Sequence, residues 1–179
     1  MTDIDARAIL LDSFDRVHEQ YPTLVQGRTR ADLLWRPDAE ANSVGWLLWH
    51  GARVQDDHLT GLATALGRPR AQAWDAFADR FALPYEHEDT GYGHSADQVG
   101  AFEAVGDDLG ELLLGYHEAV HALTVEVLTA LRPQELPTVV DRSFDPPTTA
   151  ATRLVSVVGD LLAHLGQADY VAGLRNRAA

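Results

Sequence analysis

The sequence contains no cysteine and no lysine among its 179 residues. Without cysteine the chain can form no disulfide, no thiolate metal site and no cysteine nucleophile. Without lysine it has no side-chain amine for a Schiff base or a pyridoxal cofactor, because all 14 basic side chains are arginines. Covalent catalysis through a cysteine or lysine side chain of the chain itself is therefore excluded.

Long apolar runs and positive charge are also missing. No apolar stretch approaches about 18 residues, the length of a helix that spans a bilayer. The acidic start, MTDIDARAILLDSF, lacks the basic segment and apolar core of a signal peptide. The net charge of −13 repels nucleic-acid phosphates. We therefore expect a cytoplasmic protein that binds neither membranes nor nucleic acids.

What is present is the composition of a folded domain. Hydrophobic residues make up 46% and charged residues 23% of the chain, as in ordinary globular proteins. The length suits one domain with a core of its own, and no internal repeat or low-complexity segment divides it. We expect a single domain over residues 1–179.

The spacing of apolar residues predicts four amphipathic helices with steps of three and four residues. They are expected at about Asp3–Val25, Ser43–Leu66, Asp107–Leu131 and Thr148–Arg175. With no convincing strand pattern beyond a possible short strand at Thr138–Val140, the four helices predict an all-α fold, a four-helix bundle.

A long crossover is expected between the second and third helices, from about Gly67 to Gly106. It should contain a short extra helix, Ala71–Leu83, followed by an irregular stretch, Pro84–Ser95. Connections of this length inside a compact domain tend to be functional.

Eight histidines in a chain without lysine direct attention to metal binding. Asp160 and His164 are four residues apart and share one face of the fourth helix, at the edge of its apolar arc. His50 lies at the edge of the apolar arc of the second helix. One histidine from one helix and an Asp-x-x-x-His pair from another would give three ligands and leave room for water. The alternative is a solvated helix edge with a hydrogen-bonded histidine, because such spacings are common.

Three segments carry a resemblance to a known family: NSVGWLLWHGARVQDDHL, DTGYGHS and FDPPTTAATRLVSVVGDLLAHLGQADYVAGL. The chain resembles the DinB-like superfamily of small metalloenzymes over nearly its whole length, and most of all an actinobacterial branch of unknown function. The resemblance implies a four-helix bundle that holds a divalent metal, often nickel or zinc. It also implies a metal-binding pattern of one histidine on the second helix and a His/Glu-x-x-x-His pair on the last.

Carried over to this sequence, the superfamily pattern falls on His50, Asp160 and His164. The departure is Asp160, which is one methylene shorter than glutamate. Its carboxylate either coordinates the metal directly or orients a neighbouring histidine.

The superfamily includes mycothiol-dependent maleylpyruvate isomerase and thiol S-transferases, so the resemblance implies a metal-dependent enzyme. In this hypothesis a low-molecular-weight thiol attacks a small electrophile. Arg153, two turns before Asp160, is a candidate to bind an anionic group, and His94, in a glycine-rich loop, is a candidate substrate contact. A homodimer through an outer helix face is also expected. The alternatives are a non-catalytic helical module with a degenerate metal site and a metal-dependent hydrolase.

A second motif, HEAVH at residues 117–121, matches the zinc-protease signature H-E-x-x-H. We interpret it as a coincidence. The inner stripe of the third helix runs through Tyr116, which predicts that His117 and His121 lie on a solvated flank and that Glu118 points away from the core.

The remaining histidines have simpler interpretations. His58 is about 12 Å of helix rise from His50, too far to share one metal with it, and is expected to be a hydrogen-bonded core residue. For His18 and His87 we expect only surface or packing roles.

Overall fold

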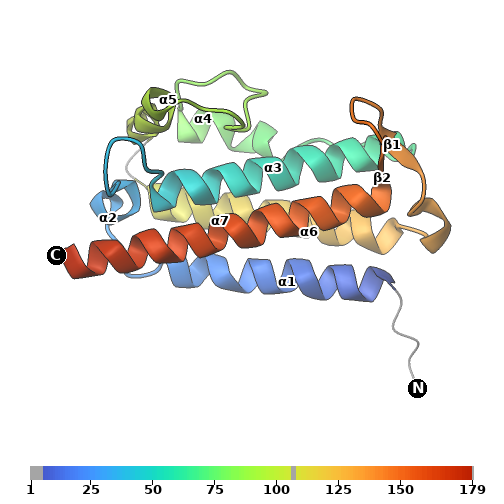
Figure 1. Cartoon of the computed structure of the whole chain (residues 1–179), viewed down its shortest axis with the longest axis horizontal. Helices are drawn as coiled ribbons and strands as arrows, with labels where there is room; N and C mark the ends of the chain where they lie inside the picture. The colour runs from blue at the N-terminus through green and yellow to red at the C-terminus, as the bar shows by residue number, and fades with distance from the viewer. Residues whose placement is uncertain (1–5, 106–107, 179) are drawn as a thin grey trace.

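The computed structural model describes residues 6–105 and 108–178. Its four long helices are α1 (Ala6–Val25), α3 (Val44–Ala65), α6 (Leu109–Ala130) and α7 (Ala150–Ala178). They confirm the predicted all-α bundle, as Figure 1 shows. The expected start of the first helix, at Asp3, lies outside the described residues.

The four long helices enclose one core. Helix α3 packs against α6 and α7, and α1 packs against the same two helices on the other side of the bundle. Figure 1 shows that α1 and α7 run in one direction and α3 and α6 in the other. Because α3 and α6 are parallel, the chain between them must return along the whole length of the bundle, which is the predicted crossover.

Apolar side chains from every long helix fill the space between them. The largest fully buried ones include Phe14, Tyr21, Trp49 and Tyr116. Burying a large apolar side chain contributes about 1.5–3 kcal/mol relative to leaving it exposed. The core therefore rests on hydrophobic burial, as expected of a chain without disulfides.

Helix α6 has a wider buried arc than predicted. It packs against α1 as well as α3, so side chains on both sides of Tyr116 lie in an interface. His117 is 1% exposed, and the prediction that it lies on a solvated flank is wrong. His121 is partly buried. Glu118 is exposed, as the sequence predicted.

Helix α3 begins where the sequence signals predicted. Ser43 adopts an extended backbone and its side chain accepts a hydrogen bond from the backbone N–H of Trp46. This N-cap satisfies one of the free amides of the first turn. The helix ends just before Gly67, whose φ of +75° leaves the helical region.

The connections contain several short elements. Helix α2 (Arg30–Leu34) precedes α3, and the crossover holds the 3-10 turn η1 (Ala73–Ala76), then α4 (Ala78–Phe81), α5 (Ala96–Ala101) and the 3-10 turn η2 (Phe102–Ala104). The helix expected at 71–83 is thus split into η1 and α4. Neither α2 nor α5 was predicted, because a helix of five or six residues is too short to show a periodic pattern.

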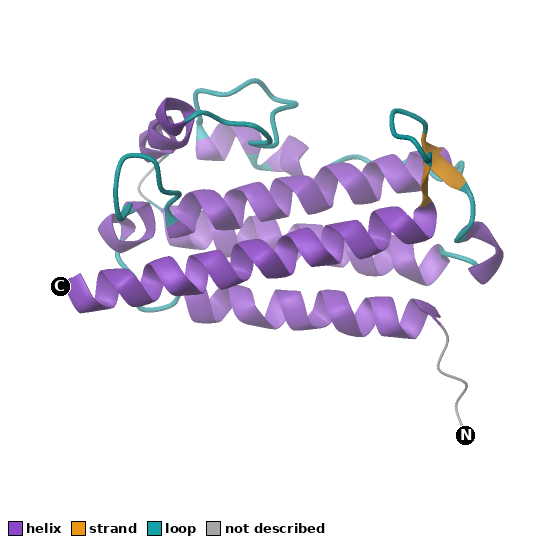
Figure 2. Ribbon diagram, viewed as in Figure 1, coloured by secondary structure: helices purple, strands orange, loops and turns teal. Residues whose placement is uncertain are grey.

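A small β-hairpin precedes α7. Strand β1 (Val139–Asp141) pairs antiparallel with β2 (Thr148–Thr149) after the 3-10 turn η3 (Pro133–Glu135). Figure 2 shows this hairpin at one end of the bundle. The short strand expected near residues 138–140 is confirmed. The pairing of β2 delays the start of the last helix from Thr148 to Ala150.

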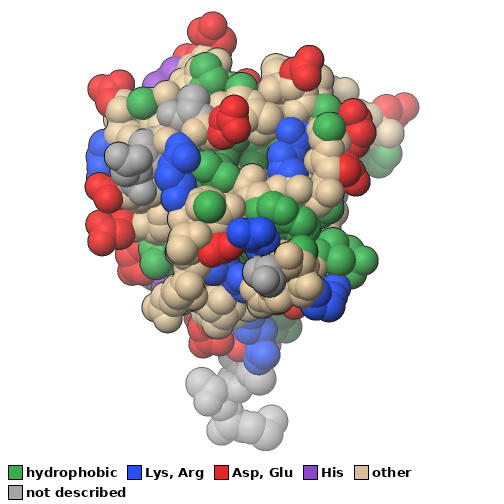
Figure 3. Space-filling model, turned by 90° about the vertical axis from the view of Figure 1, so that its left-hand side faces the viewer, with side chains coloured by type: hydrophobic (Ala, Val, Ile, Leu, Met, Phe, Trp, Pro, Cys, Tyr) green, Lys and Arg blue, Asp and Glu red, His purple; other side chains and the backbone are tan. Residues whose placement is uncertain are grey.

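The surface of the bundle carries no broad patch of one charge on the face seen in Figure 3. At the end where α2, α5 and the C-terminus lie, arginine, acidic and apolar side chains alternate over short distances. Within the described ranges, no helix combines the length and hydropathy needed to cross a membrane.

Candidate metal centre

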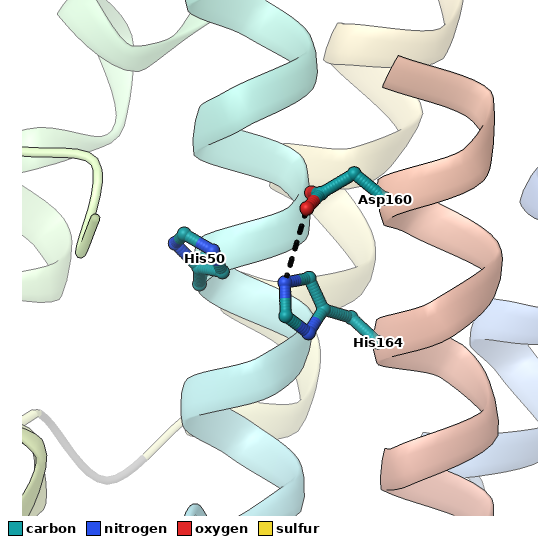
Figure 4. Close-up of side chains that lie close together, drawn as sticks. All are labelled: His50, Asp160 and His164. Atoms are coloured by element: carbon teal, nitrogen blue, oxygen red, sulfur yellow. Dashed lines mark ion pairs between the residues drawn. The ribbon is translucent and has the colours of Figure 1, made fainter. Parts of the chain in front are cut away.

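The predicted metal ligands meet at the interface of α3 and α7. His50 projects from α3, and Asp160 and His164 project toward it from neighbouring turns of α7 (Figure 4). One ligand atom from each residue lies within 4.8 Å of the others. The part of the chain that the structure describes contains no other group of three histidine or acidic side chains arranged in this way.

The spacing within the Asp160–His164 pair suits a shared cation. His164 Nε2 lies 3.4 Å from Asp160 Oδ1. Two ligand atoms that are each about 2.1 Å from a tetrahedral ion are separated by about 3.4 Å. Asp160 Oδ2 is buried and has no hydrogen-bond partner among the described residues. An unpaired buried carboxylate oxygen is costly, so this atom is consistent with a ligand site.

The electrostatics of the Asp160–His164 pair also favour a positive charge. The contact with Asp160 raises the pKa of His164, and the contact with His164 lowers the pKa of Asp160. The pair thus stabilises a positive charge at the place that a divalent ion would take. Burial lowers the pKa of His50, which keeps this imidazole neutral and able to donate a lone pair at neutral pH.

A backbone carbonyl fixes the orientation of His50. Its Nδ1 lies 2.5 Å from the carbonyl oxygen of Thr90. Since a carbonyl only accepts, Nδ1 must carry the proton, and Nε2 then has a free lone pair. Trp46 stacks on the same imidazole, with ring centroids 4.8 Å apart and planes inclined by 14°.

A cavity of about 500 Å³ adjoins the triad, and His50 and Asp160 form part of its wall. Its volume is in the range of small-molecule sites. Tyr92, from the crossover loop, and Phe144, from the loop of the hairpin, also line it, although both side chains are largely exposed. The rest of its lining is made of Val54, Asp57, His58, Thr90, Asp141, Ser143, Arg153, Ser156 and Val157.

Arg153 lies on the cavity wall as its helical phase predicted, and it is already engaged. Its Nη2 donates to Asp141 Oδ2 at 2.5 Å, and its Nη1 lies 3.3 Å from His58 Nε2. His58 is hydrogen-bonded as expected, but it lines the cavity instead of the core, and a third of its side chain is exposed. Burial lowers the pKa of His58, and the nearby Arg153 lowers it further.

His94 is not part of the cavity wall. Its side chain is 3% exposed and lies against Asp89 of the crossover and Trp46 of α3. A direct contact of His94 with a substrate stays a prediction, and its observed contacts point to a role in holding the loop.

Several residues of the site had no sequence signal. Asp141, Phe144 and Thr90 lie in loops or in a short strand, where no periodicity marks a residue as inward-facing. Their only sequence signal was the glycine pair at 91 and 93, because glycines at such spacing indicate a loop that approaches another part of the chain closely. Both glycines have positive φ in the structure.

The H-E-x-x-H segment forms no second metal centre in this arrangement. His18 of α1 stacks on His121, with ring centroids 4.1 Å apart and planes inclined by 6°. Ring-nitrogen lone pairs lie in the plane of each imidazole, so parallel stacked rings do not direct them at one ion. Glu118 is 69% exposed and pairs with His18, so it does not occupy the position of a general base.

Fold and site together define a class of protein: a helical bundle with a three-residue candidate metal centre beside a cavity. A family model described as the DinB superfamily matches residues 13–168. The crystal structure of a conserved protein from Enterococcus faecalis is similar, with 31% sequence identity and a TM-score of 0.80 over 94% of this chain and 96% of that one. No curated protein matches the sequence. The chain belongs to the DinB superfamily.

Proposed function

We propose that this protein is a metal-dependent enzyme that transfers a low-molecular-weight thiol, of the mycothiol type, to a small electrophile. The observation that carries the proposal is that His50 and Asp160 belong both to the ligand set and to the wall of the cavity. A molecule in the cavity would therefore reach the metal directly.

A divalent ion such as nickel or zinc, held there, would lower the pKa of a thiol or water at an open coordination position. His50 would supply a neutral nitrogen ligand, His164 would supply another once the ion displaces its proton, and Asp160 would supply a negative charge. Arg153 would bind an anionic group of the thiol or of the electrophile by exchanging one of its present partners, Asp141 or His58. The absence of cysteine fits a nucleophile that arrives with the cosubstrate.

Two other functions use the same residues. Activated water in place of a thiol would make the protein a hydrolase, and a ligand set that binds no metal would leave a non-catalytic helical module. The superfamily includes thiol-using enzymes, which supports the transferase, and elemental analysis of the purified protein separates the module from both enzymes.

The first experiment tests the metal site. His50→Ala and His164→Ala should each lose most of the bound nickel or zinc, measured by elemental analysis after loading. His87→Ala is the matched control, because His87 is half-exposed and pairs with Asp75 away from the triad. Unchanged occupancy in both ligand variants would show that the site lies elsewhere.

The second experiment tests thiol transfer. Metal-loaded protein is mixed with mycothiol, bacillithiol, glutathione or cysteine and with several simple electrophiles. A free thiol with a pKa near 8.5 is mostly protonated at neutral pH, so conjugation should be faster with the loaded protein than with the metal-free protein. If none of these thiols shifts the thermal transition or perturbs the spectrum of the cobalt-substituted protein, thiol transfer is refuted. The hydrolase and the non-catalytic module are then the favoured functions.

We also propose that the enzyme acts in the cytoplasm as a homodimer. Val155, Leu162 and Tyr170 are exposed apolar side chains on the outer side of α7, where a second copy would cover them. Sedimentation velocity of the wild type and of Val155→Arg tests this: a dimer that the substitution converts to a monomer supports it, and a wild-type monomer refutes it.

A further inference from the structure

The crossover loop at residues 84–95 makes its closest contacts at the face of α3 that carries His50. The carbonyl of Thr90 accepts from His50 Nδ1. The next residue, Gly91, is packed so closely that a Cβ there would lie 2.9 Å from His50 Nδ1 and 3.0 Å from the Trp49 ring. The loop therefore contacts the Nδ1 edge of the His50 imidazole.

Internal hydrogen bonds hold the loop in this conformation. The Asp89 carboxylate accepts from the backbone N–H of Gly91 at 2.7 Å and from His94 Nε2 at 2.9 Å. The Asp89 carbonyl accepts from Nε of Arg53, a fully buried residue of α3, at 3.2 Å. The segment that carries Thr90 is thus tied both to itself and to the bundle.

The protons in this network have a single consistent arrangement. The indole N–H of Trp46 only donates, and it lies 3.4 Å from His94 Nδ1. His94 Nδ1 is therefore the acceptor, and Nε2 carries the hydrogen that is donated to Asp89. On His50 the order is reversed, because the Thr90 carbonyl requires the hydrogen on Nδ1. Among the described residues none donates a hydrogen bond to His50 Nε2, so the lone pair of this nitrogen is available.

We propose that loop 84–95 is a positioning device for His50, in which Asp89, Gly91 and His94 hold the Thr90 carbonyl against Nδ1. This sets the imidazole tautomer and its rotation before any ligand binds, and it presents Nε2 to the cavity. The role in metal binding rests on the proposed function, whereas the role in setting the tautomer does not. Partners that orient a ligating histidine typically change metal affinity by about 10- to 100-fold when lost.

Two glycines of the same loop provide a matched pair of variants. Gly91 and Gly93 both have positive φ, +86° and +77°, so alanine strains the backbone at either position. Only at Gly91 does the added methyl collide with His50, since nothing lies within 4 Å of a Cβ at Gly93. A second pair is Asp89→Ala with Glu88→Ala, because Glu88 is exposed beside it.

The test has a readout that needs no metal. Long-range ¹H–¹⁵N spectra of the metal-free wild type at about pH 8, where a histidine with an ordinary pKa is neutral, should show His50 as the Nδ1–H tautomer. Gly91→Ala and Asp89→Ala should shift it toward a mixture, and Gly93→Ala and Glu88→Ala should leave it unchanged. A wild-type His50 that is not in the Nδ1–H form, or a Gly91→Ala variant that matches Gly93→Ala, overturns the proposal.

Titration with cobalt then measures the effect on the site. Gly91→Ala and Asp89→Ala should bind cobalt about 10- to 100-fold more weakly than their matched controls and alter the visible ligand-field spectrum. A wild type that binds no cobalt while its His50 tautomer is as expected would overturn the proposed function and leave the loop's effect on His50 standing. If the wild type binds cobalt and all four variants have equal affinities for it, the loop has no role in metal binding.

Discussion

The rings of Tyr21 and His117 lie face to face across the interface of α1 and α6, with centroids 3.4 Å apart and planes inclined by 1°. Neither ring nitrogen of His117 has a hydrogen-bond partner among the described residues. Burial lowers the pKa of His117 well below its usual range, and the neighbouring His18 and His121 lower it further. The folded protein therefore keeps His117 neutral.

This burial predicts acid sensitivity. Unfolded His117 takes up a proton as the pH falls through about 6.5, whereas folded His117 does not, so stability is complete above that pH and falls below it. Through His117 the wild type should lose about 1.4 kcal/mol of unfolding free energy when the pH falls from 7.5 to 5.5. The variant His117→Phe, which keeps a ring against Tyr21, should not lose this part. Urea denaturation at the two pH values measures the difference.

The matched control for this prediction is His87→Asn, because His87 is half-exposed and contacts Asp75 instead of lying in the core. It should retain the wild-type pH dependence. If His117→Phe loses stability on acidification as steeply as the wild type does, His117 is not the group responsible.

A buried ion pair predicts a large stability effect at Asp56. Its side chain and that of Arg53 are fully buried, 3.8 Å apart, and Asp56 accepts hydrogen bonds from the backbone of Trp74 and from the hydroxyl of Tyr116. Asp56→Ala should lower the free energy of unfolding by about 3–5 kcal/mol, because it leaves a buried guanidinium uncompensated. The adjacent Asp57 is 44% exposed, so Asp57→Ala should cost less than about 1 kcal/mol. Denaturant melts that give similar values for both variants would contradict this account.

Asp160 is the most informative position in the metal centre. If its carboxylate coordinates the ion directly, Asp160→Ala should abolish binding, and if it only orients His164, affinity should fall by about 10- to 100-fold. Isothermal titration with nickel or zinc distinguishes the two results. Asp169→Ala, an exposed position on the same helix, serves as control, and an affinity for Asp160→Ala equal to that of the wild type would mean that the superfamily pattern does not apply here.

The protease-like motif should be dispensable. Glu118 is exposed and is not one of the three candidate metal ligands, so Glu118→Gln should leave metal content and any activity near the wild-type level. Its carboxylate pairs with His18 at 3.3 Å, and exposed pairs of this kind contribute little to stability. A large loss of activity with an unchanged circular dichroism spectrum would argue for a catalytic role instead.

The long helices and the site residues they carry were predictable because both depend on local spacing. The four-residue step from Asp160 to His164 fixes their relative direction on any α-helix. Helix phase offered His50 as a possible third ligand, but periodicity does not say which two helices are neighbours, and the resemblance was needed to favour this combination.

The failures share a physical cause, which is that they depend on contacts between distant segments. His117 was misplaced because the sequence of α6 does not reveal that α1 covers its second side. The Thr90 carbonyl and Asp141 were missed because backbone groups and hairpin residues have no periodic signature. Short helices such as α5 depend on a cap, here Ser95 with Gln98, more than on an apolar stripe.

The separation of the ligands along the chain has a consequence for folding. His50 lies in the first third of the sequence and Asp160 more than a hundred residues later, so an ion bound by both would act as a cross-link closing a very long loop. In a chain with no disulfide, this ion would take the place of a covalent cross-link between the early and late helices. An ion present at about a hundred times its dissociation constant adds about 2.7 kcal/mol to the free energy of unfolding, so metal supply would set a substantial part of the equilibrium between the folded and the unfolded chain.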